Sequence, residues 1–243
     1  MFLSALVLGG AGPTPATDLS EVLAAPPAAD YTELAPSSTV LDGAYDLGHY
    51  AQHLGGGTES EVSAALAAFG FRRAYARSWA EPAKGSYVPG SNPRRLLTET
   101  IEEYGDAAGA GRRFSEVRDV STIGEGVTVI DSSSIPDSYA VRVSSDSSVD
   151  ELFQAVFLKG NALYTVGMDS ATDDLTSLTL AQAESEYALA PGFTIPPGTG
   201  VNPAASHLAP TWPSWIAIAF FGVSAALGVT FAVARALARR SSR

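Results

Sequence analysis

Residues 152–168, LFQAVFLKGNALYTVGM, predict a β-hairpin. Its two arms, Leu152–Leu158 and Ala162–Met168, are rich in the apolar, β-branched and aromatic residues that favour strands. Between the arms, Gly160 and Asn161 form a pair that suits a two-residue hairpin turn. We therefore expect two antiparallel strands that are direct neighbours in a sheet.

Further elements flank this hairpin in the second half of the chain. Val127–Ile130 and Ser138–Val143 have the composition of short strands. A helix is expected over residues 175–188, because Pro191 and Gly192 follow the periodic segment and end it. The second half is therefore expected to consist of several strands and one closing helix.

Two helices are expected earlier in the chain. Over Asp46–Leu54 the apolar residues recur on one helical face, and three consecutive glycines follow. Thr58 and Glu61 have the spacing of a capping box, which predicts a second helix that ends at Gly70.

The next segments are expected to be strand, strand and helix. Residues 71–79, FRRAYARSW, alternate in the manner of a strand. Leu96–Tyr104 is ambiguous between helix and strand, but its Thr and Ile content and the need for a partner strand favour a strand. Asp106 is a good N-cap for a helix that runs to about Val117.

The order of these elements predicts an α+β fold, with an antiparallel sheet and helices packed on one face of it. This order is similar to that of the small PsbP-like or cystatin-like α+β domains of exported bacterial proteins. Residues 17–190 are expected to form the domain. A length of about 170 residues can bury one hydrophobic core without covalent staples.

A nineteen-residue run without any charge, Ile216–Ala234, follows this domain near the C-terminal end of the sequence. At about 1.5 Å per residue it reaches roughly 28 Å, which is close to the hydrocarbon thickness of a bilayer. We therefore expect one transmembrane helix over 215–235, with the lipid bilayer as its partner. Residues 236–243 form a basic tail that is expected in the cytoplasm.

Small residues recur at every fourth position of the expected span. Such a spacing allows two helices to approach closely, so a homodimer within the membrane is a further expectation. The residues are Gly222, Ala226 and Thr230, together with Ser224, Gly228 and Ala232.

The charges around the span predict its orientation. Four arginines follow the apolar run 216–234, whereas Pro210–Trp215 contains no Lys or Arg, so the folded part is expected outside the cell membrane. Trp212 and Trp215 suit the headgroup layer on the outer side. Residues 1–16 are similar to the apolar core and small-residue end of a signal peptide, although they lack a basic start. Residues 191–214 are rich in Pro and Gly and are expected to form a stalk.

The composition restricts the class of function. The chain contains no cysteine, which excludes disulfides, thiol nucleophiles and thiolate metal sites. Its formal net charge is −11, and four of its 15 basic residues lie beyond the apolar run, so nucleic acid is not an expected partner. The excess of Arg over Lys and the many Ala, Gly and Pro residues resemble membrane-anchored exported proteins of high-GC Gram-positive bacteria.

One cluster of residues has the composition of a metal site. Asp42, Asp46, His49 and His53 are spaced four, three and four residues apart, so a helix would align them on one face. Asp46, His49 and His53 are the candidate ligands, although a third strong ligand and an activating Glu would have to come from elsewhere. The same histidines could instead act as an acid sensor or form a solvated helix face.

A second cluster has the composition of a binding surface. On the strand expected over 71–79, Arg73, Tyr75, Arg77 and Trp79 share one side with Phe71. Aromatic planes interleaved with guanidinium groups can stack on sugars or hold an anionic group. Alternatively, these side chains are structural, with the arginines paired to Glu99, Glu102 or Glu103 on a neighbouring strand.

No catalytic or cofactor motif is present: the chain has neither a GxSxG elbow nor a phosphate-binding loop, and no cofactor is expected. The favoured function is a membrane-anchored extracytoplasmic module without enzymatic activity, which binds an envelope polymer or another membrane protein. The alternative is an exported metal-dependent or otherwise unrecognised enzyme that uses His49 and His53.

Overall fold

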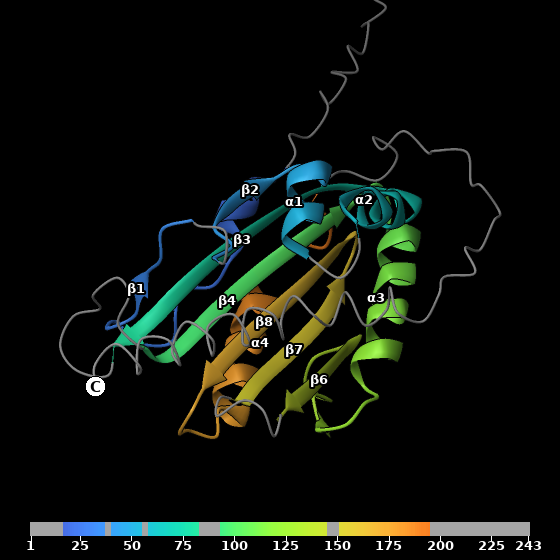
Figure 1. Cartoon of the computed structure of the whole chain (residues 1–243). Coiled ribbons are helices and arrows are strands. Elements are labelled where there is room, and N and C mark those ends of the chain that lie inside the picture. The colour runs from blue at the N-terminus through green and yellow to red at the C-terminus, as the bar shows by residue number, and fades with distance from the viewer. Residues whose placement is uncertain (1–16, 37–39, 55–57, 83–92, 145–150, 195–243) are drawn as a thin grey trace, which may run out of the picture.

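A computed structural model describes residues 17–36, 40–54, 58–82, 93–144 and 151–194. These residues form an α+β fold with one eight-stranded antiparallel sheet, so this part of the predicted fold class is confirmed (Figure 1). In their order across the sheet, the strands are β1 (Thr32–Glu33), β3 (Phe71–Pro82), β4 (Pro93–Tyr104), β8 (Ala162–Ser170), β7 (Glu151–Lys159), β6 (Ser138–Val143) and β5 (Val127–Ile130), and β2 (Gly43–Tyr45) pairs with β3 beside this path.

Helices cover both faces of the sheet. They are the short 3-10 helix η1 (Leu19–Glu21) and the α-helices α1 (Leu47–Leu54), α2 (Glu59–Ala68), α3 (Ala107–Ser121) and α4 (Thr176–Leu189). Side chains of α1, α2 and α3 join one hydrophobic cluster on what we call the front face, which is turned towards the viewer in Figure 1. Side chains of α4 and η1 join a second cluster on the opposite, back face.

The prediction that the helices pack on one face is therefore wrong. The reason lies in the hairpin, whose strands carry apolar side chains on both sides. On β7, Phe153 and Phe157 belong to the back cluster, whereas Val156 belongs to the front cluster. On β8, Tyr164 points to the back cluster and Leu163 to the front cluster. A sheet that is apolar on both faces needs cover on both faces, and α4 supplies the second layer.

The predicted hairpin is confirmed and forms the centre of the sheet. Lys159 pairs with Ala162, which leaves Gly160 and Asn161 as a two-residue turn. Gly160 has a φ of +62°, which an L side chain rarely adopts, and a Cβ there would lie 1.7 Å from the carbonyl oxygen of Gly192. Glycine is therefore required at this position both by the turn and by the close approach of the chain that follows α4.

The side chain of Asn161 joins the hairpin turn to the end of β4 and to the chain after α4. Its Nδ2 donates to the carbonyl oxygen of Tyr104 at 2.8 Å, and its Oδ1 accepts from the backbone N–H of Thr194 at 2.9 Å. The backbone N–H of Thr17 in turn donates to the carbonyl oxygen of Thr194 at 2.9 Å. The first and last described residues of the domain therefore meet beside the hairpin turn.

The predicted helix caps are confirmed. Thr58 and Glu61 form the capping box that begins α2, and Gly70 follows its end with a φ of +79°. Asp106 caps α3, because its Oδ1 accepts from the backbone N–H of Gly109 at 2.7 Å. Local side-chain chemistry therefore determines where these two helices begin.

The strand predicted over 71–79 and the strand preferred over 96–104 are confirmed as β3 and β4. One detail of β3 differs, because Phe71 does not share a face with Arg73, Tyr75, Arg77 and Trp79. Phe71 pairs with Tyr104 and Arg73 pairs with Glu103, so Arg72 is an extra residue at a β-bulge. The bulge reverses the alternation and turns Phe71 to the front cluster.

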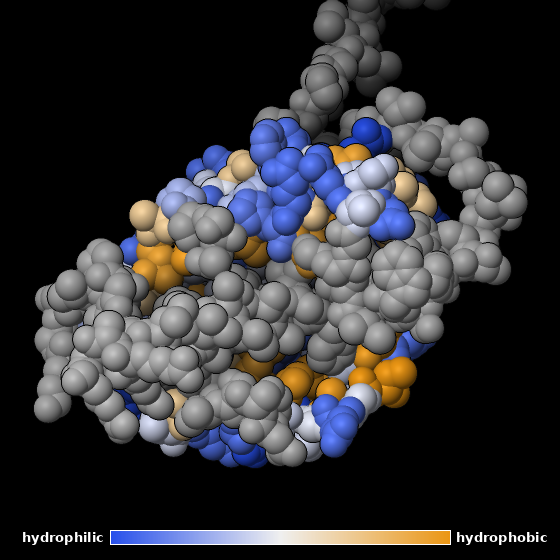
Figure 2. All heavy atoms as spheres, viewed as in Figure 1, coloured by the Kyte–Doolittle hydropathy of each residue, from blue (hydrophilic) through white to orange (hydrophobic). Residues whose placement is uncertain are grey.

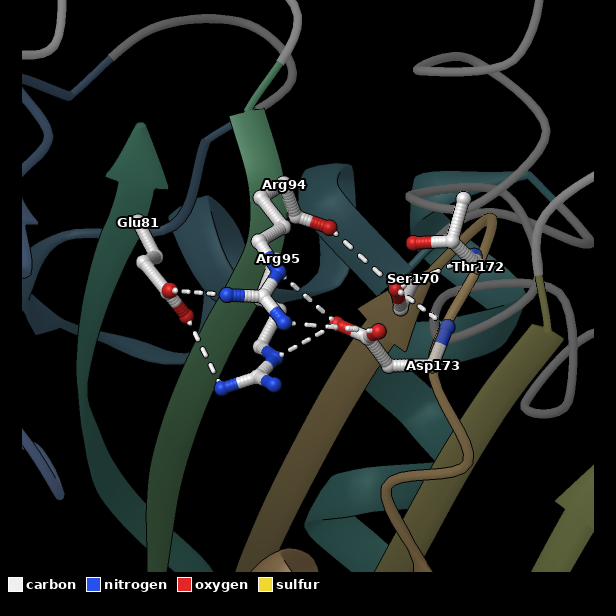
Figure 3. A network of polar contacts seen from close by, with 6 residues as sticks. All are labelled: Glu81, Arg94, Arg95, Ser170, Thr172 and Asp173. Atoms are coloured by element: carbon white, nitrogen blue, oxygen red, sulfur yellow. Dashed lines mark hydrogen bonds and ion pairs between the residues drawn. The ribbon is translucent and has the colours of Figure 1, made fainter. Parts of the chain in front are cut away.

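A network of ion pairs joins the ends of β3 and β4 to the connection between β8 and α4 (Figure 3). The Nε atoms of Arg94 and Arg95 lie 3.0 and 2.9 Å from Asp173 Oδ2, and both arginines also contact Glu81. The hydroxyl oxygen of Ser170 accepts from the backbone N–H of Asp173 at 3.2 Å. We call Glu81, Arg94, Arg95 and Asp173 the Asp173 latch, and it holds the chain just before α4.

No helix in the described part of the chain is long and apolar enough to cross a membrane. The span predicted over 215–235, the stalk residues beyond Thr194, the basic tail and the signal-like residues 1–16 lie outside the described residues.

Candidate ligand cavity

The front face of the sheet holds a cavity of about 80 Å³, which we call the ligand cavity. Its floor is formed by β4, β8 and β7, and its walls are α1 and α3. The residues that line it include Leu96, Thr98, Thr100 and Glu102 of β4, Leu163, Thr165, Gly167 and Asp169 of β8, Leu152 and Gln154 of β7, Tyr50 and Leu54 of α1, and Arg113 and Val117 of α3.

The hollow in the floor arises at Gly167. In the register of the sheet, Gly167 lies directly between Thr98 of β4 and Gln154 of β7. The next row of the same face places Thr100 beside Thr165. A position without a side chain is therefore surrounded by short hydroxyl side chains and one amide, which leaves space above the strand.

The backbone does not require glycine at position 167. A Cβ there would have the carbonyl oxygen of Thr98, at 3.7 Å, as its one close neighbour, which is an ordinary van der Waals contact. Glycine in the interior of a central strand costs stability and often marks a place where a ligand or another chain approaches closely. Because a side chain would fit at position 167, the glycine there favours a role for the open space as room for another group.

One end of the cavity is closed by a buried ionic network. The hydroxyl of Tyr50 donates to Glu102 Oε1 at 2.9 Å, and the hydroxyl of Tyr104 donates to Glu102 Oε2. Arg113, which is 3 % exposed, donates from its Nε to Glu102 Oε2 at 3.3 Å. The carboxylate thus receives two phenol hydroxyls and one guanidinium group.

Burial and neighbouring charges shift the pKa values of Arg113 and of the two tyrosines in this network. Burial lowers the pKa of Arg113, but the nearby Glu102, Tyr104 and Glu116 outweigh that effect and raise it above its ordinary value. Burial, together with the Glu102 carboxylate, raises the pKa of both Tyr50 and Tyr104. The phenols therefore remain hydrogen-bond donors at physiological pH, and Arg113 stays charged beside Glu102.

The lining offers both apolar contacts and hydrogen-bonding groups. Leucine side chains offer apolar contact, and threonine and glutamine side chains both donate and accept hydrogen bonds. Such a mixture fits an uncharged ligand with apolar and polar parts.

The predicted metal ligands lie outside this cavity. His49 Nδ1 and Asp46 Oδ1 are 2.9 Å apart, but both side chains are about 70 % exposed, at 72 % and 69 %. Asp46 also accepts from the backbone N–H of His49, so it acts as a cap of α1. The ring of His53 packs edge-on against Tyr45 at 5.3 Å.

These contacts do not assemble a coordination site. Asp42 donates its backbone N–H to the hydroxyl of Tyr45 at 2.9 Å, and no group of three His, Cys, Asp or Glu residues converges in the described part of the chain. Figure 2 shows hydrophilic side chains gathered over α1, as expected for a solvated helix face.

The predicted binding stripe on β3 faces the back of the sheet, away from the cavity. Arg73 Nη2 lies 2.9 Å from Glu103 Oε2 and donates to the carbonyl oxygen of Thr17 at 2.7 Å. Arg77 Nε lies 3.3 Å from Glu33 Oε1, Trp79 is buried and Tyr75 is half-buried. The structure thus gives both arginines partners within the domain, and the predicted Arg73–Glu103 pairing is present.

The residues of the ligand cavity are not identifiable as a site from the sequence patterns above. Gly167 is a usable signal, because an isolated glycine within a strand pattern suggests close approach of another group. The floor residues Thr98, Thr100 and Thr165 give no such signal, since threonine is common in strands. Arg113 could not be placed because its partner Glu102 lies on another element.

Comparisons with known proteins leave the family of the chain unassigned. No protein-family model and no curated protein matches it. Among solved structures it is similar to the extracellular domain of PknH from Mycobacterium tuberculosis, with 13 % sequence identity and a TM-score of 0.45. That match covers 73 % of this chain and 98 % of the PknH domain.

Proposed function

We propose that this protein is a single-pass, extracytoplasmic binding module that takes a small uncharged ligand in the ligand cavity. The observation that carries the proposal is the hollow at Gly167, which the fold does not require and which hydrogen-bonding side chains surround. The closure of one end by the neutralised Glu102–Arg113 pair supports an uncharged ligand, because a charged ligand would lack a free partner there.

The chemistry of the lining favours a sugar-like unit of an envelope polymer. Such a unit carries hydroxyl and amide groups that match Thr98, Thr165 and Gln154, and it has apolar carbon faces that match the leucines of the floor. N-acetylglucosamine is an uncharged probe with all of these groups. The binding is expected to be weak, because one sugar unit buries little surface.

Filling the hollow is expected to abolish this binding without harm to the fold. We expect Gly167→Val to leave the stability unchanged or to raise it by up to about 1 kcal/mol, because valine favours strands and glycine does not. In saturation-transfer NMR with the full chain, the N-acetylglucosamine signal is expected to disappear in this variant.

Thr165→Val is the matched control for this experiment, since it keeps the volume of the side chain and removes one hydroxyl group. It is expected to weaken the signal without removing it. A signal of equal strength in wild type and Gly167→Val would refute binding in this cavity, and no signal from the wild type would refute the proposed ligand.

The proposed location rests on the sequence outside the described residues. The uncharged run 216–234 is long enough to span a bilayer, and the four arginines that follow it favour a cytoplasmic end. An acidic, cysteine-free domain is then presented to the outside, where envelope polymers are available.

Removal of residues 215–243 is expected to release the chain from the membrane. The full chain should remain in the membrane fraction after an alkaline carbonate wash, which strips peripheral proteins, whereas the truncated chain should be in the soluble fraction. The control is a chain that lacks only residues 236–243, which keeps the apolar run. If the truncated chain stayed with the membranes, the single-span proposal would be wrong.

A further inference from the structure

Two carboxyl groups are buried together between the back face of the sheet and α4. Glu99 of β4 and Glu186 of α4 are both 0 % exposed. The side of α4 that faces the sheet is unusually polar, since its buried residues are Thr179, Gln182, Ala183 and Glu186. We call Glu99 and Glu186 the acid pair.

The acid pair has few hydrogen-bond partners. Gln182 Nε2 donates to Glu99 Oε1 at 2.7 Å and also to the carbonyl oxygen of Ala25 at 2.8 Å. Glu99 Oε2 and both carboxyl oxygens of Glu186 have no hydrogen-bond partner in the described part of the chain. Burial of a charge without partners is costly, so the unpaired oxygens favour a protonated carboxyl group.

The charged and titratable groups around the acid pair do not offset a negative charge on it. From β3, Arg77 acts on Glu99 across the sheet, but its guanidinium group already lies beside Glu33. From β8, Tyr164 faces Glu186, and Glu103 of β4 acts on the same phenol. Lys159 of β7 donates to the carbonyl oxygen of Tyr187 at 2.7 Å and is thereby occupied near the end of α4.

These surroundings raise both carboxyl pKa values. Burial raises the pKa of Glu99 to about 7, although the hydrogen bond from Gln182 and the charge of Arg77 oppose the shift. Burial, with the charge of Glu99 added, raises the pKa of Glu186 well above its ordinary value. The two carboxyl groups therefore hold their protons to a higher pH while α4 is packed on β4 than when α4 and β4 are separated.

We propose that the acid pair is a proton-operated clasp, which holds α4 on the back of the sheet at acidic pH and loosens it as the surroundings become alkaline. The sign follows from linkage: a raised carboxyl pKa gives a stabilisation that is fully present below the ordinary value of 4.5 and is lost as pH rises through about 7.

The position of α4 gives this clasp a consequence. It is the last helix of the described part of the chain, and the Pro- and Gly-rich residues that lead to the predicted span follow it. The Asp173 latch fixes the chain before α4 (Figure 3). Asn161 fixes the chain after α4. Loosening is therefore confined to the helix between these two attachments, where it exposes the part of the back face that α4 covers.

Hydrogen exchange of the full chain in detergent, at pH 5 and pH 8 and corrected for intrinsic rates, tests the clasp. We expect the protection factors of the α4 amides to fall roughly 100-fold from pH 5 to pH 8. The reason is that the equilibrium constant for opening of α4 rises about tenfold for each pH unit between the ordinary and the raised pKa of a buried carboxyl group. The double variant Glu99→Gln with Glu186→Gln, in which neither group can ionise, is expected to keep α4 protected at pH 8, whereas Glu186→Gln alone is expected to reduce the fall in protection without removing it. Amides of β7 serve as the internal reference.

Glu184→Gln is the matched control, because Glu184 is exposed on the same helix and the chemical change is identical. It should follow the wild-type profile. Glu99→Gln provides a second, independent variant in which the pH dependence is likewise expected to be reduced. Equal protection of wild-type α4 at both pH values would overturn the clasp, and so would an unchanged pH dependence in both Glu186→Gln and Glu99→Gln.

Discussion

Replacement of Arg113 by methionine is expected to destabilise the domain by about 3–5 kcal/mol, the range for breaking a buried ion pair. Arg113 is 3 % exposed, and its partner Glu102 is 7 % exposed. Without the guanidinium group, the carboxylate keeps the hydroxyls of Tyr50 and Tyr104 but loses its only opposite charge among the contacts described for it. Urea unfolding at pH 7, followed by circular dichroism, measures the loss.

Arg112→Met provides the matched control for this prediction. Arg112 is the preceding residue of α3 and is exposed, so its replacement should change the stability by less than about 0.5 kcal/mol. If Arg113→Met cost no more than Arg112→Met, the buried pair would have no part in stability.

A second variant tests whether the loss is due to the unpaired charge. Glu102→Gln removes the negative charge but keeps an oxygen that accepts from a phenol. The double variant Arg113→Met with Glu102→Gln should therefore be more stable than Arg113→Met alone, because position 102 then no longer holds a buried charge without its partner. A double variant that is less stable than either single variant would indicate that packing, not charge, dominates.

The elements that could be predicted from sequence are those with local physical causes. The Gly160–Asn161 turn, the capping box of Thr58 and Glu61 and the N-cap Asp106 each act within a few residues of themselves. Such signals remain valid whatever the rest of the chain does. The hairpin and the starts of α2 and α3 are correctly predicted for this reason.

Features that depend on distant partners could not be predicted. The apolar residues of β7 indicate a strand, but they do not by themselves specify that helices cover both of its faces. The bulge at Arg72 depends on the register with β4, which no local pattern specifies. Both errors concern which face a residue or a helix occupies.

The candidate sites illustrate the same limit. His49, His53 and the arginines of β3 stand out in the sequence because their residue types carry chemistry, yet the described contacts leave the exposed His49 on a solvated helix face and give the arginines partners within the domain. Glu99 and Glu186 have ordinary residue types for their elements and are unusual only through their burial, which requires the fold. Gly167 gives a signal within its strand, but the open space above it likewise requires the fold.

Two glycines of α3 provide the second large prediction, because the same substitution is expected to act in opposite directions. Gly109 and Gly111 both have ordinary helical conformations, so alanine at either position gains about 0.5–1 kcal/mol from helix propensity. A Cβ at Gly111 would have its nearest neighbour, Leu158 Cδ2, at 4.0 Å, and Gly111→Ala is therefore expected to stabilise the domain.

A Cβ at Gly109 would instead lie 2.1 Å from the carbonyl oxygen of Phe69, the residue that ends α2. This neighbour is backbone, so α2 and α3 must move apart, and the bond from the Gly109 N–H to Asp106 at the start of α3 is disturbed with them. We expect Gly109→Ala to cost about 3 kcal/mol, the upper end of the usual range for overpacking. Thermal unfolding of both variants measures the difference. Because the propensity gain is common to both, that difference isolates the helix contact, and two variants of equal stability would mean that α2 does not end against α3.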